Sequence, residues 1–453
     1  MVEKDPQLTA LEAGELDVFV ETMEASRLEV IGSQAWIDWH IRLQKLNQQA
    51  VLEATTLQEE QTKEALISCG KLPILVHEAI CIQVWRLKIY PQILKLDPSP
   101  TNTFGIYMVL YHEAVAVGLL ETVLFHEDGA QCINEVAVDL LEYAVEQLTA
   151  LLALLNMDYL NKIEPAAMTE SAIEELERQK KGLQFDISMR CITIVRYLAE
   201  HMEIAGVGAS MATNLFKISD VPSLLAHLIE LQPWKRANDK GDMELFNYGL
   251  WNKASDEEIA QLHRTEAQLW LCLRQLLLEP RLAHYYVIDD CRRSAFCKIQ
   301  SKITEEMLDQ IPPLGELKNF LCRLSVGDYS PMQQPNGAKN PGCTLIQVVP
   351  QIKEAYMKQV HRRTKTVAKA QLGCFQMDGS DESREMAKKL LESYTSDAAL
   401  AMDGGGAKCA KCGDKASKKC ARCKQEWYCG RECQVQQWPK HKDICDQFAN
   451  LIV

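Results

Sequence analysis

The sequence lacks an excess of positive charge. Across 453 residues, 49 Lys and Arg stand against 62 Asp and Glu, which leaves a formal net charge of −13. Segment 404–453 is locally basic, so the rest of the chain is more acidic than this total. Proteins that bind the phosphate backbone of nucleic acid present a basic surface. We therefore expect no nucleic acid among the partners.

A secretory leader and long apolar runs are also missing. The first residues, 1–6, are acidic and lack the basic-then-apolar pattern of a signal peptide. The longest uninterrupted apolar runs, such as 151–155, are far shorter than the roughly 20 residues that span a bilayer. The apolar stretch 106–125 contains His112, Glu113 and Glu121, which indicates a buried core helix. We expect no membrane span and a cytosolic protein, whose thiols stay reduced or bind metal.

Most cysteines show no short paired spacing. Of the 17 cysteines, seven lie between residues 409 and 445, and ten are scattered over the rest of the chain. Apart from Cys291 and Cys297, those ten have no near neighbour of their kind. Most occur in apolar helical contexts, where a free thiol behaves as a small hydrophobic side chain. We interpret most of them as core residues.

Strand signals are scarce as well. Alternating β-branched runs bounded by turns are not evident, so no sheet is expected. Apolar residues instead recur at three- and four-residue steps over 140–155, 192–198 and 269–277, as in amphipathic helices packed on neighbours. The sequence predicts a mainly α fold.

Proline recurs at the predicted starts of helices. Pro73, Pro222 and Pro312 each follow an aliphatic residue and precede an apolar helical run. Proline suits the first helical turn because its missing N–H would have no partner there. Similar starts occur in armadillo and HEAT arrays, although no period of roughly 40 residues is present here. We predict an irregular armadillo/HEAT-like stacked-helix body, an architecture that commonly serves as a scaffold.

Composition divides the chain into three parts. Residues 1–372 form the predicted helical body, interrupted by polar connections at 156–169, 235–249 and 326–342 and closed by a charged helix over 351–372. Residues 373–406 form a linker with a short helix near 382–394 and a Gly-rich end at 404–406. Residues 407–447 enclose the cysteine cluster.

The cysteine cluster has the composition of a metal site. Its eight candidate ligands are Cys409, Cys412, Cys420, Cys423, Cys429, Cys433, His441 and Cys445. Eight Cys and His ligands complete two tetrahedral zinc sites and leave no open position for a substrate water. About 40 residues bury too little surface to fold alone, so metal binding would supply the missing free energy. Spacing alone leaves open whether the ligands pair sequentially or interleave.

The cluster resembles the MYND zinc finger, with Trp427 and Tyr428 before Cys429 and Gln434 to Trp438 before His441. This resemblance implies two structural zinc ions and an interleaved ligation. The implied ligands of one zinc are Cys409, Cys412, Cys429 and Cys433, and those of the other are Cys420, Cys423, His441 and Cys445. MYND modules bind short proline-containing peptides, and the contact positions of the family correspond to Gln434 and Trp438. Alternatively, Trp438 fills the small core of the finger, as we expect of Trp427 and Tyr428.

The resemblance extends into the body. The matching blocks are 32–33, Trp36, His40, 43–55, 102–104, 106–109, 112–114, 119–123, 233–234, Trp251, Gln268, Trp270 and 426–429. Together they are similar to a family of MYND-type factors for the preassembly of axonemal dynein arms. The similarity weakens over 157–180, over 326–343 and in the linker. It implies a cytoplasmic adaptor, enriched near the centrosome, centriolar satellites and ciliary base.

The same resemblance implies partners. The finger would meet a leucine-rich-repeat, CS-domain assembly factor. The complex would act with heat-shock chaperones on dynein heavy and intermediate chains.

Rival functions are a nuclear corepressor adaptor and a lysine methyltransferase. The methyltransferase domain found in some MYND proteins is β-rich, and its cofactor motifs are missing here, so we predict no enzyme and no catalytic residue. Residues 337–344 imitate a phosphate-binding loop but have Cys343 where the lysine belongs. The His-Glu pairs at 77, 112 and 126 are interpreted as surface or partly buried pairs. The basic run 361–365 is interpreted as a solvated helix face, with a localisation or partner patch as the alternative.

Overall fold

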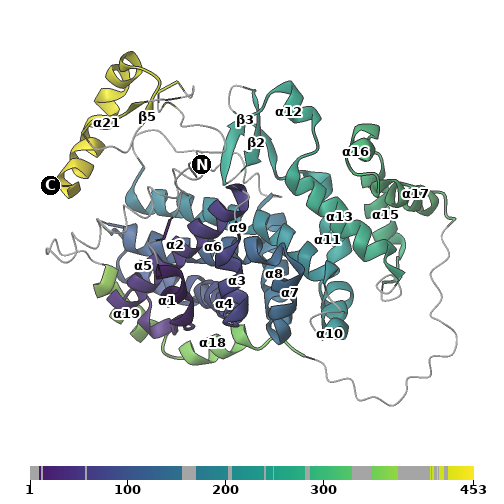
Figure 1. Cartoon of the computed structure of the whole chain (residues 1–453), viewed down its shortest axis with the longest axis horizontal. Helices are drawn as coiled ribbons and strands as arrows, with labels where there is room; N and C mark the ends of the chain where they lie inside the picture. The colour runs from purple at the N-terminus through teal and green to yellow at the C-terminus, as the bar shows by residue number, and fades with distance from the viewer. Residues whose placement is uncertain are drawn as a thin grey trace, which may run out of the picture.

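The computed structural model describes the chain outside residues 1–9, 12–13, 57–58, 101, 156–169, 202–206, 239–240, 248, 281–285, 329–347, 376–408, 410, 413–415, 417, 423–426 and 453 (Figure 1). The linker helix predicted at 382–394 and the Gly-rich end at 404–406 lie outside the described residues. So do the connection at 156–169, the loop imitating a phosphate-binding motif, and Cys423.

The body is built from helices joined mostly by short connections. Its first helices are α1 (Glu15–Glu21), α2 (Gln34–Thr56), α3 (Gln61–Ser68), α4 (Leu72–Lys88), α5 (Tyr90–Leu96), α6 (Phe104–Leu124), α7 (Glu127–Cys132), α8 (Ala137–Leu155) and α9 (Ala172–Glu200). They are followed by α10 (Gly208–Thr213), α11 (Val221–Leu231), α12 (Asp256–Ala260), α13 (Arg264–Leu278), α15 (Asp290–Gln300), α16 (Glu305–Gln310), α17 (Leu314–Ser325), α18 (Ile352–Val360) and α19 (Thr364–Phe375). Short elements are the 3₁₀ helices η1 (Leu28–Val30) and η2 (Asn134–Val136) and the π-helical turn η4 (Asn214–Ile218).

Helix α6 lies at the centre of the N-terminal half of the body. It is apolar around its whole circumference, which is typical of a helix enclosed by others. Helices α2, α4 and α9 pack against it. By length and composition it could cross a membrane, but 78% of its most apolar window is buried inside the body. The prediction of a buried core helix over 106–125 is confirmed.

Further helices add to this centre one after another. Helix α9 also packs against α8 and α13, α13 against α11, α11 against α15, and α15 against α17. In Figure 1 this succession extends from α5 and α19 at one end to α16 and α17 at the other. The mainly α prediction is confirmed. The largest buried side chains include Trp85, Trp234 and Trp270, and Trp36 is buried with them.

Proline occupies the expected position in two of the three predicted helix starts. Pro73 and Pro222 lie in the first turns of α4 and α11. The third case differs, because α17 begins only at Leu314 and Pro313 is the residue before it. Two consecutive prolines restrict the backbone ahead of them, so this helix starts after the pair.

The expectation that no sheet exists is wrong. The predicted connection at 235–249 forms most of an antiparallel sheet of β1 (Lys235–Ala237), β2 (Met243–Asn247) and β3 (Leu250–Lys253), ordered β1-β2-β3. The strands are short, and the two buried side chains of β2, Leu245 and Phe246, are adjacent rather than alternating. The two-residue period that marks a half-buried strand is therefore missing from the sequence.

The charged helix predicted over 351–372 is two helices, α18 and α19. The helices meet at Arg362, whose φ of 65° is left-handed and interrupts the helical path. Both pack onto the beginning of the body: the Tyr356 hydroxyl donates to the Ser26 carbonyl (2.9 Å), and Gln371 Nε2 donates to the Leu28 carbonyl (2.6 Å). Side-chain periodicity does not reveal a corner of this kind, since the apolar spacing continues through it.

The interpretation of the scattered cysteines as mostly core residues is also wrong. Among those that the structure describes, Cys81, Cys191 and Cys272 are buried. The half-buried members are Cys132, Cys297 and Cys322, and the exposed members are Cys69, Cys291 and Cys374. For these six, apolar neighbours in the sequence do not ensure burial.

The pair His112-Glu113 is a core group, whereas the pair at 77 is partly buried, with His77 half-buried and Glu78 in the core. Glu78, His112 and Glu113 are almost fully buried, together with His40. His112 links His40 and Glu78 by hydrogen bonds. Its Nδ1 is 2.9 Å from His40 Nδ1, and its Nε2 is 2.9 Å from Glu78 Oε2. The carboxylate of Glu113 accepts from the Arg86 guanidinium (3.1 Å) and from the Tyr143 hydroxyl (2.9 Å). Buried polar groups persist when they find partners, and these partners come from other helices.

His263 fastens the small sheet to α13. Its Nδ1 accepts from the Thr265 backbone N–H (3.2 Å), and its Nε2 donates to the Phe246 carbonyl (3.1 Å). This pattern requires the neutral ring, because protonation would remove the acceptor. Burial, together with the nearby positive charge of Lys235 and Arg264, lowers the pKa of His263 to about 4, although the bond to Phe246 opposes this shift.

We predict that the body loses stability on mild acidification. The pKa of His263 is about 4 in the folded chain and 6.5 for an unperturbed histidine, so the unfolded state binds more protons between these two values. Burial followed by the neighbouring His112 also lowers the pKa of His40. The stabilisation is complete above pH 6.5 and falls toward pH 5, with up to about 2 kcal/mol of the loss coming from His263.

Urea unfolding at several pH values measures this loss. His263→Gln, which cannot titrate, should show a shallower fall than the wild type, whereas the exposed His227→Gln should behave like the wild type. An identical slope in His263→Gln and wild type would contradict the assignment.

Candidate metal centre

The C-terminal module combines a small hairpin with one helix. Strands β4 (Lys418–Lys419) and β5 (Trp427–Tyr428) pair antiparallel, with Lys418 opposite Tyr428 and Lys419 opposite Trp427. Helix α21 (Arg431–Ile452) follows directly and packs on β5. The hairpin and the helix together bring distant cysteines within reach of one another.

The first metal group consists of Cys409, Cys412, Cys429 and Cys433. Their sulfur atoms all lie within 4.8 Å of one another. Cys429 Sγ is 3.5 Å from Cys412 Sγ and 3.4 Å from Cys433 Sγ, and Cys433 Sγ is 3.8 Å from Cys412 Sγ. Tetrahedral zinc with Zn–S bonds of about 2.3 Å separates its sulfur ligands by about 3.8 Å. The spacing of the four sulfurs therefore suits one zinc ion.

The second metal group contains Cys420, His441 and Cys445. One ligand atom of each lies within 4.8 Å of the others. All three side chains are buried, and the two sulfurs are 3.8 Å apart. Cys423, which the MYND resemblance adds as the fourth ligand, lies outside the described residues. A buried pair of thiols with an imidazole is a ligand chemistry that zinc prefers.

The two groups interleave along the chain. Cys420 belongs to the second group although it lies between members of the first, and Cys429 and Cys433 return to the first group. The sequence left sequential and interleaved pairing open, and the structure has the interleaved grouping. Interleaving ties the hairpin and α21 together twice, so neither group can form without the other part of the module in place.

Helix α21 supplies ligands to both groups. Cys433 lies in its first turn, and His441 and Cys445 follow four residues apart on one side of the helix. The first group also favours a thiolate. Burial would raise the pKa of Cys409, but backbone N–H groups of Cys429, Cys412 and Lys411 outweigh it and lower the pKa to about 6. Hydrogen bonding with the Cys433 thiol, in contrast, raises the pKa of Cys429. A divalent cation removes this conflict by holding all the sulfurs as thiolates.

The two residues expected to contact a partner lie on the outer part of α21. Gln434 and Trp438 are both half-buried, and Val435 beside them is 63% exposed. The Trp438 ring meets the His441 ring edge-on at 5.9 Å. Trp438 therefore does contribute to the small core while part of its ring stays accessible. Tyr428 is buried, as expected of a core residue, whereas Trp427 is half-buried under the Lys419 ammonium (4.7 Å).

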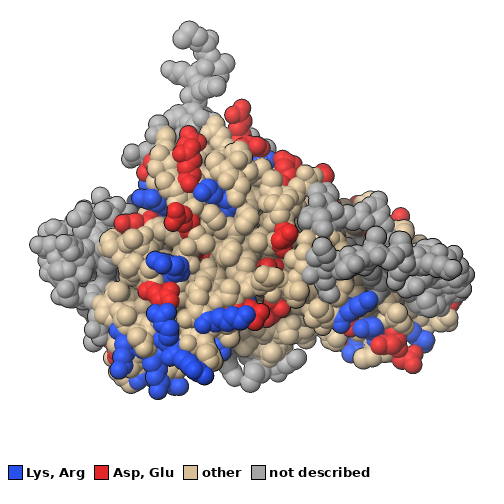
Figure 2. Space-filling model, turned by 90° about the horizontal axis from the view of Figure 1, so that it is seen from below, with Lys and Arg blue, Asp and Glu red and all other residues tan. Residues whose placement is uncertain are grey.

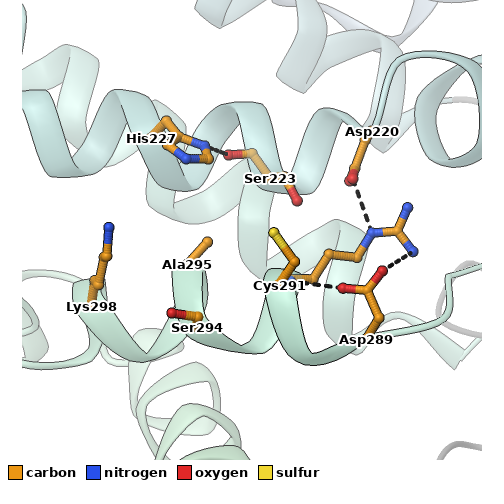
Figure 3. Close-up of a pocket in the computed structure, with 9 residues that line it drawn as sticks. Asp220, Ser223, His227, Asp289, Cys291, Ser294, Ala295 and Lys298 are labelled. Carbon is orange, nitrogen blue, oxygen red and sulfur yellow. Dashed lines mark hydrogen bonds and ion pairs between the residues drawn. The ribbon is translucent and has the colours of Figure 1, made fainter.

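The body also contains an open pocket that sequence reasoning missed (Figure 3). It measures about 330 Å³ and lies between α11, which carries Ser223 and His227, and α15, which carries Cys291 and Lys298. Asp220 accepts from the Arg292 guanidinium (2.9 Å), and Asp289 caps α15. His227 Nδ1 donates a hydrogen bond to the Ser223 carbonyl (2.7 Å), so this nitrogen is not available as a base that activates a nucleophile. The charged groups of the pocket are paired, Arg292 with Asp220 and Asp289 and Lys298 with Glu230.

Together, the helical body and the double Cys/His cluster define a MYND-finger protein. Residues 409–445 match the MYND finger family, and the module carries two structural zinc ions. The chain is similar to the Zinc finger MYND domain-containing protein 10 homolog of Drosophila melanogaster, with 34% identity over 453 residues that cover 95% of this chain and 98% of the relative. It belongs to the zinc finger MYND domain-containing protein 10 family.

A second relative matches over a shorter stretch. Protein CBFA2T2 of Xenopus laevis is 32% identical over 107 residues, which cover 22% of this chain and 18% of that protein. No solved structure matches the chain.

We predict that either Cys420→Ser or His441→Ala lowers the zinc content below two ions per chain and unfolds the finger. Structural zinc contributes on the order of 10 kcal/mol of folding free energy, far more than so small a core supplies. Metal analysis and hydrogen exchange of 409–452 measure the effect. Cys374→Ser, at an exposed cysteine outside both groups, is the control. Retention of full zinc content in both variants would exclude Cys420 and His441 as ligands.

Proposed function

We propose that this protein is an adaptor whose MYND finger docks a partner protein while its helical body holds further proteins. The observation that carries the proposal is the two Cys/His clusters beside the accessible side of α21, with four cysteines in the first and three described ligands in the second, to which the MYND resemblance adds Cys423. Zinc sites whose ligands all come from the protein leave no position for a substrate and serve structure. What the finger offers to other molecules is its surface.

The surface on α21 supports a peptide ligand. Gln434 and Trp438 are four residues apart and therefore lie on one side of the helix, next to the exposed Val435. An aromatic ring beside an amide suits an extended, proline-containing segment. The ring packs against the proline, and the amide forms hydrogen bonds with the backbone of the segment. This is the arrangement expected from the MYND resemblance.

We further propose that the adaptor works in the preassembly of axonemal dynein arms in the cytoplasm, near the centrosome, centriolar satellites and ciliary base. The support is the full-length relationship to the Drosophila relative and the resemblance blocks spread through the body. In this proposal the finger meets a leucine-rich-repeat, CS-domain factor, and heat-shock chaperones act on dynein heavy and intermediate chains held by the body.

The rival functions find less support in the described residues. A methyltransferase of the MYND class needs a β-rich domain, and the sheet of the body consists of three short strands. For a nuclear corepressor, no observation of the body or the finger argues in favour.

We predict that Gln434→Ala/Trp438→Ala removes one partner from complexes purified from ciliating cells, while chaperones and dynein chains remain bound. Losing a central aromatic anchor costs a peptide interface roughly 2 kcal/mol or more, which is sufficient for loss on washing. Gln436→Ala, at an exposed amide on another side of α21, is the matched control. Metal analysis must show unchanged zinc content in each variant.

Two outcomes would reject parts of the proposal. If the double variant keeps every partner, Trp438 is a core residue and the docking surface lies elsewhere. If wild-type complexes contain neither chaperones nor dynein chains, the proposed role in dynein preassembly is wrong, whatever the finger binds.

A further inference from the structure

Positive charge gathers where α18 meets α19. Residues 351–375 contain six Lys and Arg but only one acidic residue, Glu354, in a chain whose net charge is −13. Figure 2 views the molecule from the side on which α18 and α19 lie in Figure 1, and it shows Lys and Arg side chains crowded over one part of that side. The six Lys and Arg of 351–375 include those of the basic run 361–365, which the sequence led us to interpret as a solvated helix face.

Ion pairing divides these six cations into two kinds. Lys353 pairs with Glu146 of α8, Lys358 Nζ lies 2.7 Å from Glu354 Oε1, and Arg363 Nη1 lies 3.1 Å from Glu29 Oε1. The pairs of Lys353 and Arg363 join α18 and the corner before α19 to the body, whereas Lys358 and Glu354 pair within α18. The other three are Arg362, Lys365 and Lys369, which we call the basic stripe.

The basic stripe is exposed and makes no ion pair with any residue that the structure describes. Lys365 and Lys369 are four residues apart on one side of α19, and Arg362 lies in the corner just before this helix. The opposite side of α19 is buried against the body, through Val367, Ala368, Gln371 and Phe375. The orientation of the stripe toward solvent is thus set by the packing of α19.

The stripe works against the stability of the fold. Lys365 and Lys369 are like charges four residues apart, an arrangement that destabilises a helix. Arg362 adopts a φ of 65°, which glycine tolerates and a residue with a side chain does not favour. Strained residues and uncompensated charges concentrate at sites of binding.

We propose that the basic stripe docks an acidic segment of a partner protein. Carboxylates on that segment would meet Arg362 at the corner and Lys365 and Lys369 on α19. A membrane is a poorer occupant, because none of the exposed large apolar side chains of the described residues lies on α18 or α19 to enter a bilayer. Nucleic acid is poorer too, since the acidic chain repels a polyanion that extends beyond the stripe.

The test uses the full-length, zinc-loaded protein and a fluorescent helical peptide of Glu and Ala with Glu at three- and four-residue steps. Fluorescence anisotropy at increasing salt gives the affinity. We expect Arg362→Ser/Lys365→Ser/Lys369→Ser to weaken binding on the order of tenfold and to flatten its salt dependence. Lys217→Ser/Arg293→Ser/Lys302→Ser loses the same charge elsewhere on the body and should bind within about twofold of wild type.

Two further variants separate binding from folding. Arg362→Gly should raise Tm, because glycine adopts the positive φ at this position without strain. The same variant should still weaken binding of the peptide. Cys420→Ser should leave peptide binding intact, because the stripe belongs to the body, so failure of the finger proposal and failure of this one are distinguishable.

Several results would overturn the proposal. The first is an equal loss of peptide affinity in the two triple variants. The second is a wild type that does not bind the peptide. The third is a wild type that binds phosphatidylserine vesicles more tightly than the peptide. The acidic sequence that follows α19 is an alternative occupant of the basic stripe. If neutralising Asp378, Asp381, Glu382 and Glu385 creates peptide binding that the wild type lacks, the stripe serves this chain's own segment and not a partner.

Discussion

The architecture of the body follows from the need to enclose α6. A helix that is apolar on every side cannot rest on a surface, and it must be covered by several neighbours. Helices α2, α4 and α9 provide this cover, and α9 in turn packs against α8 and α13. The succession through α13, α11, α15 and α17 is then a continuation of the same burial away from the centre. Because each added helix covers its predecessor, the body grows by stacking rather than around one sheet.

The same enclosure explains why charged groups are found in the core. Glu113 and His112 sit on α6 itself, so they are buried wherever α6 is buried. Each meets a partner from another helix: Arg86 and Tyr143 for Glu113, and Glu78 for His112. Removing one member of such a set would leave an uncompensated buried charge, which costs more than the intact set contributes. These residues therefore impose the mutual positions of α4, α6 and α8.

The finger follows a different physical rule. Its apolar core is small, consisting of Tyr428, Ala416 and the buried ligands with Trp427 and Trp438 alongside, and metal binding takes the place of a large hydrophobic core. Because the ligand groups interleave, the zinc ions hold the hairpin and α21 in one arrangement. That arrangement leaves the side of α21 with Gln434 and Val435 accessible. The body and the finger thus obtain rigidity by separate means, which suits an adaptor with two independent docking regions.

Much of this was available from the sequence alone. Residue types and spacing were sufficient for the helical class, for α6 as a core helix and for the seven described Cys and His residues of the two metal groups, because helical periodicity and metal ligation are local patterns. Tertiary structure decided what depends on distant partners. It decided the interleaved grouping of ligands and the burial of His112 and Glu78. It also decided the sheet at β1–β3, whose two adjacent buried residues gave no alternation, and which of the scattered cysteines are buried. The break at Arg362 belongs to the same group, since the hydrogen bonds of Tyr356 and Gln371 that hold α18 and α19 reach residues more than 300 positions earlier. A sequence records which side of a helix is apolar, but only the packed chain determines what that side meets.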